Sequence, residues 1–248
     1  MDVTVRSNPN NVYQTPVGRD KLLRTAQYFS QFYIWHLYRR NYRQSVIDPY
    51  SAVRKQLGTT RKILRLGNFL GNLQTLGRVM SKTNSNEPVL EYLAIGGQLG
   101  FGGYLFFDNI TAIKAIGIHK LPSAERLDIL ADKFWAAGLI CSIVTCIYTL
   151  LHSQPGKRTK REDDEPDLDD KTRAKYVGLL YHSHAIQNAN WLSSRKRSAA
   201  WIQLISDLCD LTVPGKTLGC TALDDGIVGI AGTMSSLIGV WSQWKQTA

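Results

Sequence analysis

A few short motifs in this sequence could carry chemistry, and each lacks the partners that the chemistry requires. The run Pro214-Gly215-Lys216-Thr217 resembles the end of a phosphate-binding loop, but Asp210 occupies the position of the earlier glycine that such a loop needs. His182 and His184 are two residues apart, with no cysteine or carboxylate set at the spacing of a metal site. No Gly-x-Ser-x-Gly nucleophile motif occurs. We therefore predict a protein that is not an enzyme and has no metal or other cofactor.

The most informative stretch is residues 61–80, which combines apolar and basic side chains at helical spacing. On a helical wheel, seven apolar side chains fall within an arc of about 140°. They are Ile63, Leu66, Phe69, Leu70, Leu73, Leu76 and Met80. The basic side chains expected to bind lipid head groups are Arg61, Lys62, Arg65, Arg78 and Lys82. A basic amphipathic helix is typical of a membrane-surface segment or a calmodulin target.

Periodicity alone leaves another interpretation of residues 61–80 open. Most amphipathic helices place their apolar side against a protein core, with a basic face in solvent. Gly67, Gly71 and Gly77 each weaken an isolated helix by about 1 kcal/mol. That cost fits a helix that forms fully only against a surface. Periodicity by itself favours the core-facing interpretation.

The charge distribution also indicates a polyanionic partner. The 248 residues carry a net charge of +10, and residues 1–121 hold the whole excess. Such asymmetry is typical of proteins that bind nucleic acid or an anionic membrane. No nucleic-acid-binding motif is present, and three apolar segments argue for the membrane instead: 92–107, 134–151 and 226–244. A bilayer core requires about 20 residues, so the second and third segments are plausible spans and the first is borderline.

These elements predict an all-α, membrane-associated protein with amphipathic helices and about two hydrophobic anchor helices. Thr15-Pro16 has the form of a helix start, and we expect a helix from Gly18 to Arg43 that is interrupted by Asp48-Pro49. Small residues suited to close helix contact predict self-association through Gly96, Gly100, Gly229, Gly232 and Ser236. The expected organisation is a loose N-terminus over 1–14, a basic amphipathic helical region over 15–82, hydrophobic helices over 83–153, a charged linker over 154–175 and C-terminal helices over 176–248.

Two blocks near the ends of the chain resemble the peroxin-eleven family of peroxisomal membrane-proliferation proteins, and its fungal members most. The first block runs from Thr15 to Ser30, and its motif residues are Gly18, Arg19, Asp20, Lys21, Gln27 and Tyr28. The second is the glycine- and serine-rich block over 229–239, followed by Trp244. With the order of segments between them, the resemblance covers nearly the whole chain.

The resemblance implies a peroxisomal membrane protein that promotes membrane elongation, fission and proliferation of peroxisomes. It also implies self-association into a homo-oligomer and cooperation with a fission machinery that includes a dynamin-like GTPase. In the family an amphipathic helix binds and tubulates membranes rich in anionic lipids, a role that would fall on residues 61–80 here. The alternative function is a peroxisomal membrane pore that transports metabolites.

Overall fold

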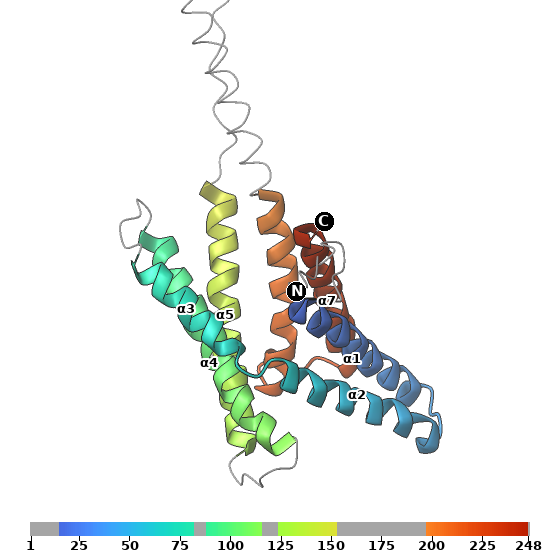
Figure 1. The fold of residues 1–248 in the computed structure, drawn as a ribbon. Coiled ribbons are helices and arrows are strands. Elements are labelled where there is room, and N and C mark those ends of the chain that lie inside the picture. The colour runs from blue at the N-terminus through green and yellow to red at the C-terminus, as the bar shows by residue number, and fades with distance from the viewer. Residues whose placement is uncertain (1–14, 82–87, 116–123, 153–196, 248) are drawn as a thin grey trace, which may run out of the picture. The chain divides into compact units, whose positions relative to one another are not determined.

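The computed structural model describes residues 15–81, 88–115, 124–152 and 197–247, where every regular element is an α-helix (Figure 1). The helices are α1 (Pro16–Arg39), α2 (Gln44–Leu64), α3 (Asn68–Ser81), α4 (Pro88–Ala115), α5 (Ala124–His152), a helix over residues 197–217, and α7 (Asp225–Thr247). The all-α prediction is confirmed. The N-terminus over 1–14 and the charged linker lie outside the described residues.

The chain divides into two compact units. One comprises residues 1–145 and 204–248, and it contains all the contacts discussed below. The other comprises residues 146–203, of which the structure describes the last turns of α5 and the first turns of the helix over 197–217.

Helix α1 begins where its sequence predicts. The Thr15 hydroxyl accepts a hydrogen bond from the backbone N–H of Gly18 at 3.0 Å, and Pro16 occupies the first turn. The helix ends at Arg39, because the chain turns at Asn41, whose φ is 52°. The predicted helix break at Asp48-Pro49 was wrong, because Pro49 lies in the first turns of α2 and the break falls between Arg39 and Gln44.

The predicted continuous helix over residues 61–80 is two helices. Helix α2 ends at Leu64, residues 65–67 form a turn, and α3 begins at Asn68. Gly67 has a φ of 81°, a conformation that glycine adopts without the steric cost of a side chain. A single helical wheel therefore does not describe the whole segment.

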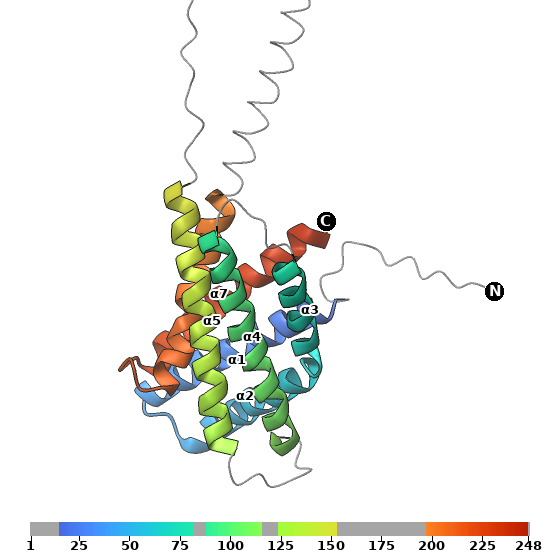
Figure 2. The same cartoon turned by 90° about the vertical axis from the view of Figure 1, so that its left-hand side faces the viewer.

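The two ends of the chain pack together as α1 and α7, which lie side by side in both views (Figures 1 and 2). Bulky side chains of α1 pack directly against glycines of α7. A Cβ added at Gly232 would lie 2.5 Å from the ring of Tyr28, and one at Gly229 would lie 2.7 Å from the backbone of Phe32. Ser236 is fully buried beside them.

The other predicted small-residue face joins α4 to α5. A Cβ at Gly100 would lie 2.5 Å from the backbone of Gly138, and one at Gly96 would lie 3.0 Å from Cys141 Sγ. The residues predicted for self-association thus pack within a single chain, on α4 and on α7 alike. Contact between copies at these residues would require the helix pairs to separate.

Among the described helices, one is long and apolar enough to cross a membrane, the part of α5 from Glu125 to His152. Its most apolar 18-residue window is only 22% buried. Helix α7 does not meet the same criteria, so the described residues contain one candidate span where about two anchors were predicted. The side of α7 that packs against α1 consists of small residues such as Gly229 and Gly232, whereas Ile230, Met234 and Leu237 are exposed.

Candidate membrane-binding surface

Helix α3 and the turn before it present an apolar face that the rest of the described chain leaves exposed. Leu70, Leu73 and Met80 are 54%, 51% and 57% exposed. Leu66 in the turn and Ile63 at the end of α2 are exposed as well. We call these five residues the wedge face.

The other two predicted wedge residues point elsewhere. Phe69 and Leu76 are half-buried. The Phe69 ring makes an edge contact with Phe106 of α4, with ring centroids 5.8 Å apart. One side of α3 therefore packs along α4 (Figure 2). The wedge face on its other side is exposed. Exposed, contiguous apolar side chains on a helix mark a surface for a membrane or a protein partner.

The basic residues around the wedge face do not share its exposure. Arg61 is buried, and it donates hydrogen bonds to Asp20 at 3.0 Å and to Gln27 at 2.7 Å. Lys62 donates to Asp128 at 3.1 Å. These contacts tie α2 to α1 and α5.

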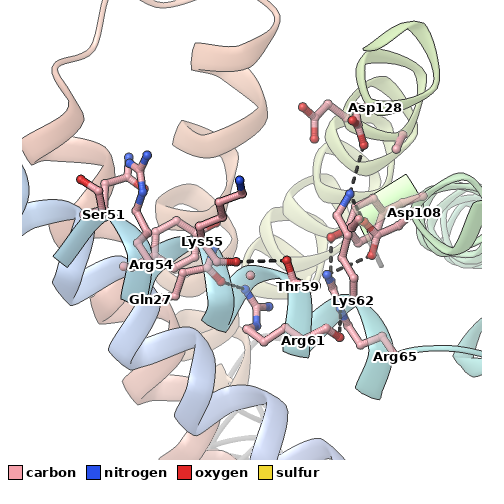
Figure 3. Close-up of a pocket in the computed structure, with 17 residues that line it drawn as sticks. Gln27, Ser51, Arg54, Lys55, Thr59, Arg61, Lys62, Arg65, Asp108 and Asp128 are labelled. Carbon is pink, nitrogen blue, oxygen red and sulfur yellow. Dashed lines mark hydrogen bonds and ion pairs between the residues drawn. The ribbon is translucent and has the colours of Figure 1, made fainter. Parts of the chain in front are cut away.

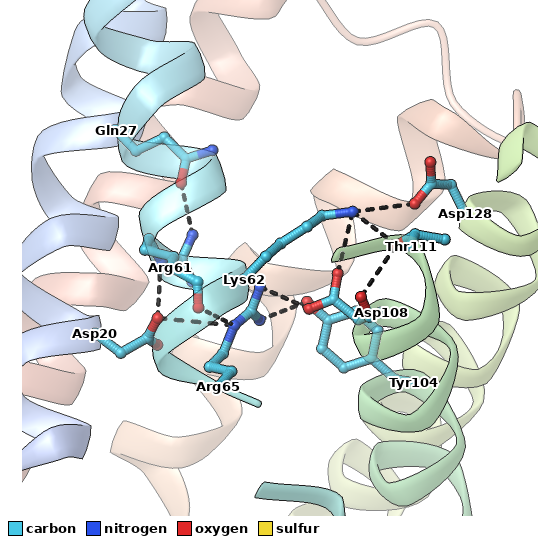
Figure 4. A network of polar contacts seen from close by, with 9 residues as sticks. All are labelled: Asp20, Gln27, Arg61, Lys62, Arg65, Tyr104, Asp108, Thr111 and Asp128. Carbon is cyan, nitrogen blue, oxygen red and sulfur yellow. Dashed lines mark hydrogen bonds and ion pairs between the residues drawn. The ribbon is translucent and has the colours of Figure 1, made fainter. Parts of the chain in front are cut away.

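Arg65 completes this set of contacts on α4. It lies 2.9 Å from the Asp108 carboxylate and donates to the Tyr104 hydroxyl at 2.7 Å. Lys62 reaches the same Asp108 at 3.4 Å. We call the whole set the polar network; its members are Asp20, Gln27, Arg61, Lys62, Arg65, Tyr104, Asp108, Thr111 and Asp128 (Figure 4).

Burial and neighbouring charges change the pKa of the two arginines in the polar network. Burial lowers the pKa of Arg61, and the charge of Arg65 lowers it further, whereas Asp20 opposes both. Burial also acts to lower the pKa of Arg65, but Tyr104 and Asp108 outweigh it and raise the pKa overall. An arginine stays charged under physiological conditions, so removing either partner would leave a buried charge unpaired.

We predicted that five basic residues bind lipid head groups. In the structure they differ in exposure and in their partners. Arg61, Lys62 and Arg65 have internal partners in the polar network, so we assign them to holding α2 against its neighbours. Arg78 is exposed on α3. Lys82 lies outside the described residues.

The motif residues of the N-terminal block also hold helices together. Asp20 and Gln27 belong to the polar network. The Lys21 side chain covers Gly239 of α7, and the Tyr28 ring covers Gly232. Gly18 is buried at the start of α1, and Arg19 is exposed on the first turns.

The site also contains acids that the sequence analysis did not select. Asp108 accepts two cations of the polar network. The Asp210 carboxylate forms an ion pair with Arg24, with Nη2 and Oδ1 2.5 Å apart, and it also accepts a hydrogen bond from the Ser235 hydroxyl. Asp108 stands inside an otherwise apolar stretch, and Asp210 lies among apolar residues with one other acid, Asp207, three positions before it. An acid in such a stretch is buried only with a partner, and that position is the signal that could have revealed both.

Comparison with known proteins agrees with the resemblance of the two end blocks. The family model of peroxisomal biogenesis factor 11 (PEX11) matches residues 10–244. The chain belongs to the PEX11 family. It is a peroxisomal membrane protein of the group that acts in peroxisome biogenesis.

Curated relatives of this PEX11 protein cover most of its length. Peroxisomal membrane protein PMP30B of Candida boidinii is 28% identical over 245 residues, covering 93% of this chain and 90% of the relative. Peroxisomal membrane protein 11A of Rattus norvegicus is 24% identical, with 90% of each chain covered. Peroxisomal biogenesis factor 11 of Schizosaccharomyces pombe is 19% identical, covering 92% and 90%. No solved structure matches.

Proposed function

We propose that this PEX11 protein shapes the peroxisomal membrane by inserting the wedge face of α3 into one leaflet. Insertion on one side expands that leaflet relative to the other and favours the curvature needed for elongation and fission. The observation that carries the proposal is the exposure of Leu70, Leu73 and Met80 on one side of a helix in a peroxisomal membrane protein.

The energetics of insertion are favourable. Full burial of a Leu-sized side chain is worth about 1.5–3 kcal/mol, and the wedge residues have roughly half of that still to gain. Five such residues give roughly 4–7 kcal/mol, and Arg78 adds about 1 kcal/mol at an anionic surface. If α5 anchors the chain, insertion does not also have to overcome the loss of translational freedom.

The contacts that hold α3 and the end of α2 in place also support a role in membrane insertion. Phe69 packs on α4, and the polar network fixes the end of α2 to α1, α4 and α5. A rigidly supported apolar face transmits its inserted volume to the membrane instead of yielding. No catalytic step is part of the proposal. Binding of anionic lipids, self-association and cooperation with a dynamin-like fission GTPase belong to it as the extensions that family membership favours.

The direct test reconstitutes the full chain in liposomes of graded anionic-lipid content and images them by electron microscopy. Leu70→Glu with Leu73→Glu should abolish tubules, because two carboxylates replace inserted apolar groups. The matched control, Asn68→Glu with Gln74→Glu, adds the same charge at exposed α3 positions outside the apolar arc and should retain tubules. Intact tubulation by the first variant, with circular dichroism showing both folded, would refute the wedge mechanism.

A metabolite pore is the second candidate, favoured by polar contacts inside the helix bundle. The Ser142 hydroxyl donates to Asp207 at 2.5 Å, and Asp210 bonds to both Arg24 and Ser235. Polar side chains that pair between apolar helices are one way to line a solute path. Selective solute flux through sealed vesicles that persists in Leu70→Glu with Leu73→Glu would support this function over the wedge.

A further inference from the structure

A cavity of about 690 Å³ lies beside α2, and no wedge-face residue lines it (Figure 3). One face of α2 and the turn after it supply the basic lining: Arg54, Lys55, Arg61, Lys62 and Arg65. Tyr28 and two glutamines of α1 line it as well, and the remaining wall comes from α4 and α5. Three carboxylates line the same space: Asp108, Asp128 and Asp132. The lining therefore has an excess of positive charge.

The cations of this cavity fall into two groups. Arg61, Lys62 and Arg65 are the inner group, and the polar network holds them. Arg54 and Lys55 project from the same helix farther from the α2–α3 turn, and no ion pair within the described residues includes them. Asp225 of α7 acts on Arg54 at a distance, but Lys216 already pairs with that carboxylate at 2.7 Å.

Neutral hydrogen-bonding groups surround the two outer cations. Ser51 stands one turn before Lys55 on α2, and Thr59 stands one turn after it. The Thr59 hydroxyl donates to the Lys55 backbone carbonyl at 3.2 Å, so toward a ligand hydroxyl it serves as an acceptor. Gln27 of α1 lines the same space. Charged donors ringed by hydroxyl and amide groups suit a phosphate on a hydroxylated carrier, because the phosphate takes the charge-assisted bonds and the carrier takes the neutral ones.

We propose that this cavity binds a phosphate monoester of a polyol, with Arg54 and Lys55 as the phosphate ligands and Ser51 and Thr59 as partners of the hydroxyls. A phosphate monoester carries a charge of about −1.5 to −2 at neutral pH, which matches the positive excess of the lining. A cavity of this volume exceeds the needs of inorganic phosphate and lies in the range of small-molecule sites. A phosphorylated inositol head group and a free sugar phosphate share this chemistry.

The test measures binding by the full chain in detergent and in nanodiscs. The soluble probe is inositol bisphosphate, followed by calorimetry. The lipid probe is a vesicle with phosphatidylinositol monophosphate, compared with a phosphatidylserine vesicle of equal total charge. Saturable binding of the soluble probe places recognition in the phosphorylated head group alone. Saturable binding of the lipid probe only shows that the ligand is a membrane lipid, and it supports the site equally.

Variants locate the bound ligand. Arg54→Gln with Lys55→Gln should weaken binding about ten-fold or more, since two charge-assisted contacts are lost. The matched control, Arg40→Gln with Arg43→Gln, removes the same charge from exposed positions between α1 and α2 and should leave binding unchanged. Ser51→Phe fills the cavity without altering its charge and should also weaken binding.

Three results would overturn the proposal: no saturable binding of either probe, equal weakening by the two double variants, or equal binding of phosphatidylserine vesicles. None of the variants alters α3. A failure here therefore leaves the wedge mechanism standing, and loss of tubulation in the wedge variant says nothing about this cavity.

Discussion

Arg24 and Asp210 form a buried ion pair whose loss should destabilise the whole fold. Their side chains are 7% and 12% exposed, and both guanidinium nitrogens Nη1 and Nη2 donate to the carboxylate. Asp210 also accepts from Ser235, so the pair joins α1, the helix over 197–217 and α7. Burial alone would lower the pKa of Arg24, but the Asp210 carboxylate raises it overall.

The expected cost follows from leaving a charge unpaired. Arg24→Met keeps the packing volume and removes the partner of a carboxylate that is nine-tenths buried. Breaking such a pair from one side costs about 3–5 kcal/mol, which corresponds to a fall in melting temperature of roughly 6–20 °C for a chain of this size. Replacing both partners, as Arg24→Met with Asp210→Leu, should restore much of the loss, because no buried charge remains.

Thermal unfolding followed by circular dichroism in detergent measures these changes. Arg43→Met is the matched control, since Arg43 is exposed, and it should shift the melting temperature little. A double variant that loses as much as the two single variants together would refute the reasoning, because it would show no coupling between the two side chains.

Two further predictions concern stability. Gly100→Ala should destabilise the fold, because its Cβ would lie 2.5 Å from the backbone of Gly138. Gly71→Ala, with nothing within 4 Å of its Cβ, should stabilise α3 by about 1 kcal/mol. Equal melting temperatures for the two variants would contradict the packing of α4 on α5. The hydrogen bond from Lys216 lowers the pKa of Asp225, so its stabilisation is present above the unfolded pKa of about 3.9 and disappears as the pH falls through the lowered value. Asp225→Asn should therefore reduce the melting temperature at pH 6, and the difference should shrink as the pH falls below the unfolded pKa of Asp225; a pH-independent difference would contradict this.

Local signals in the sequence located most of the helices and the wedge face. Thr15-Pro16 marked the start of α1, because a cap depends on neighbouring residues only. The spacing of Leu70 and Leu73 predicts that they share a side of one helix, and both are exposed on α3, whereas Leu66 is exposed in the turn before it. The turn at Gly67 was missed, since glycine is compatible both with a helix and with a positive φ.

Pairing across the chain is what the sequence could not reveal. Arg61 contacts Asp20, and Arg65 contacts Asp108. Each partner lies more than forty residues away. A run of cations with no nearby acid looks free for an anionic surface until the fold brings acids from other helices to it. Likewise, the small residues around Gly232 predict close packing but not whether the partner is the same chain or another copy.

The membrane contact of the wedge face is best tested with a photoreactive residue at Leu73 or at Gly71 of the full chain, reconstituted in anionic vesicles. Position 73 lies in the middle of the wedge face, and position 71 lies on the exposed side of α3 away from it. The account predicts strong cross-linking to lipid acyl chains from position 73 and little from position 71. Equal lipid cross-linking at both positions, or cross-links from position 73 to protein alone, would contradict insertion of the wedge face.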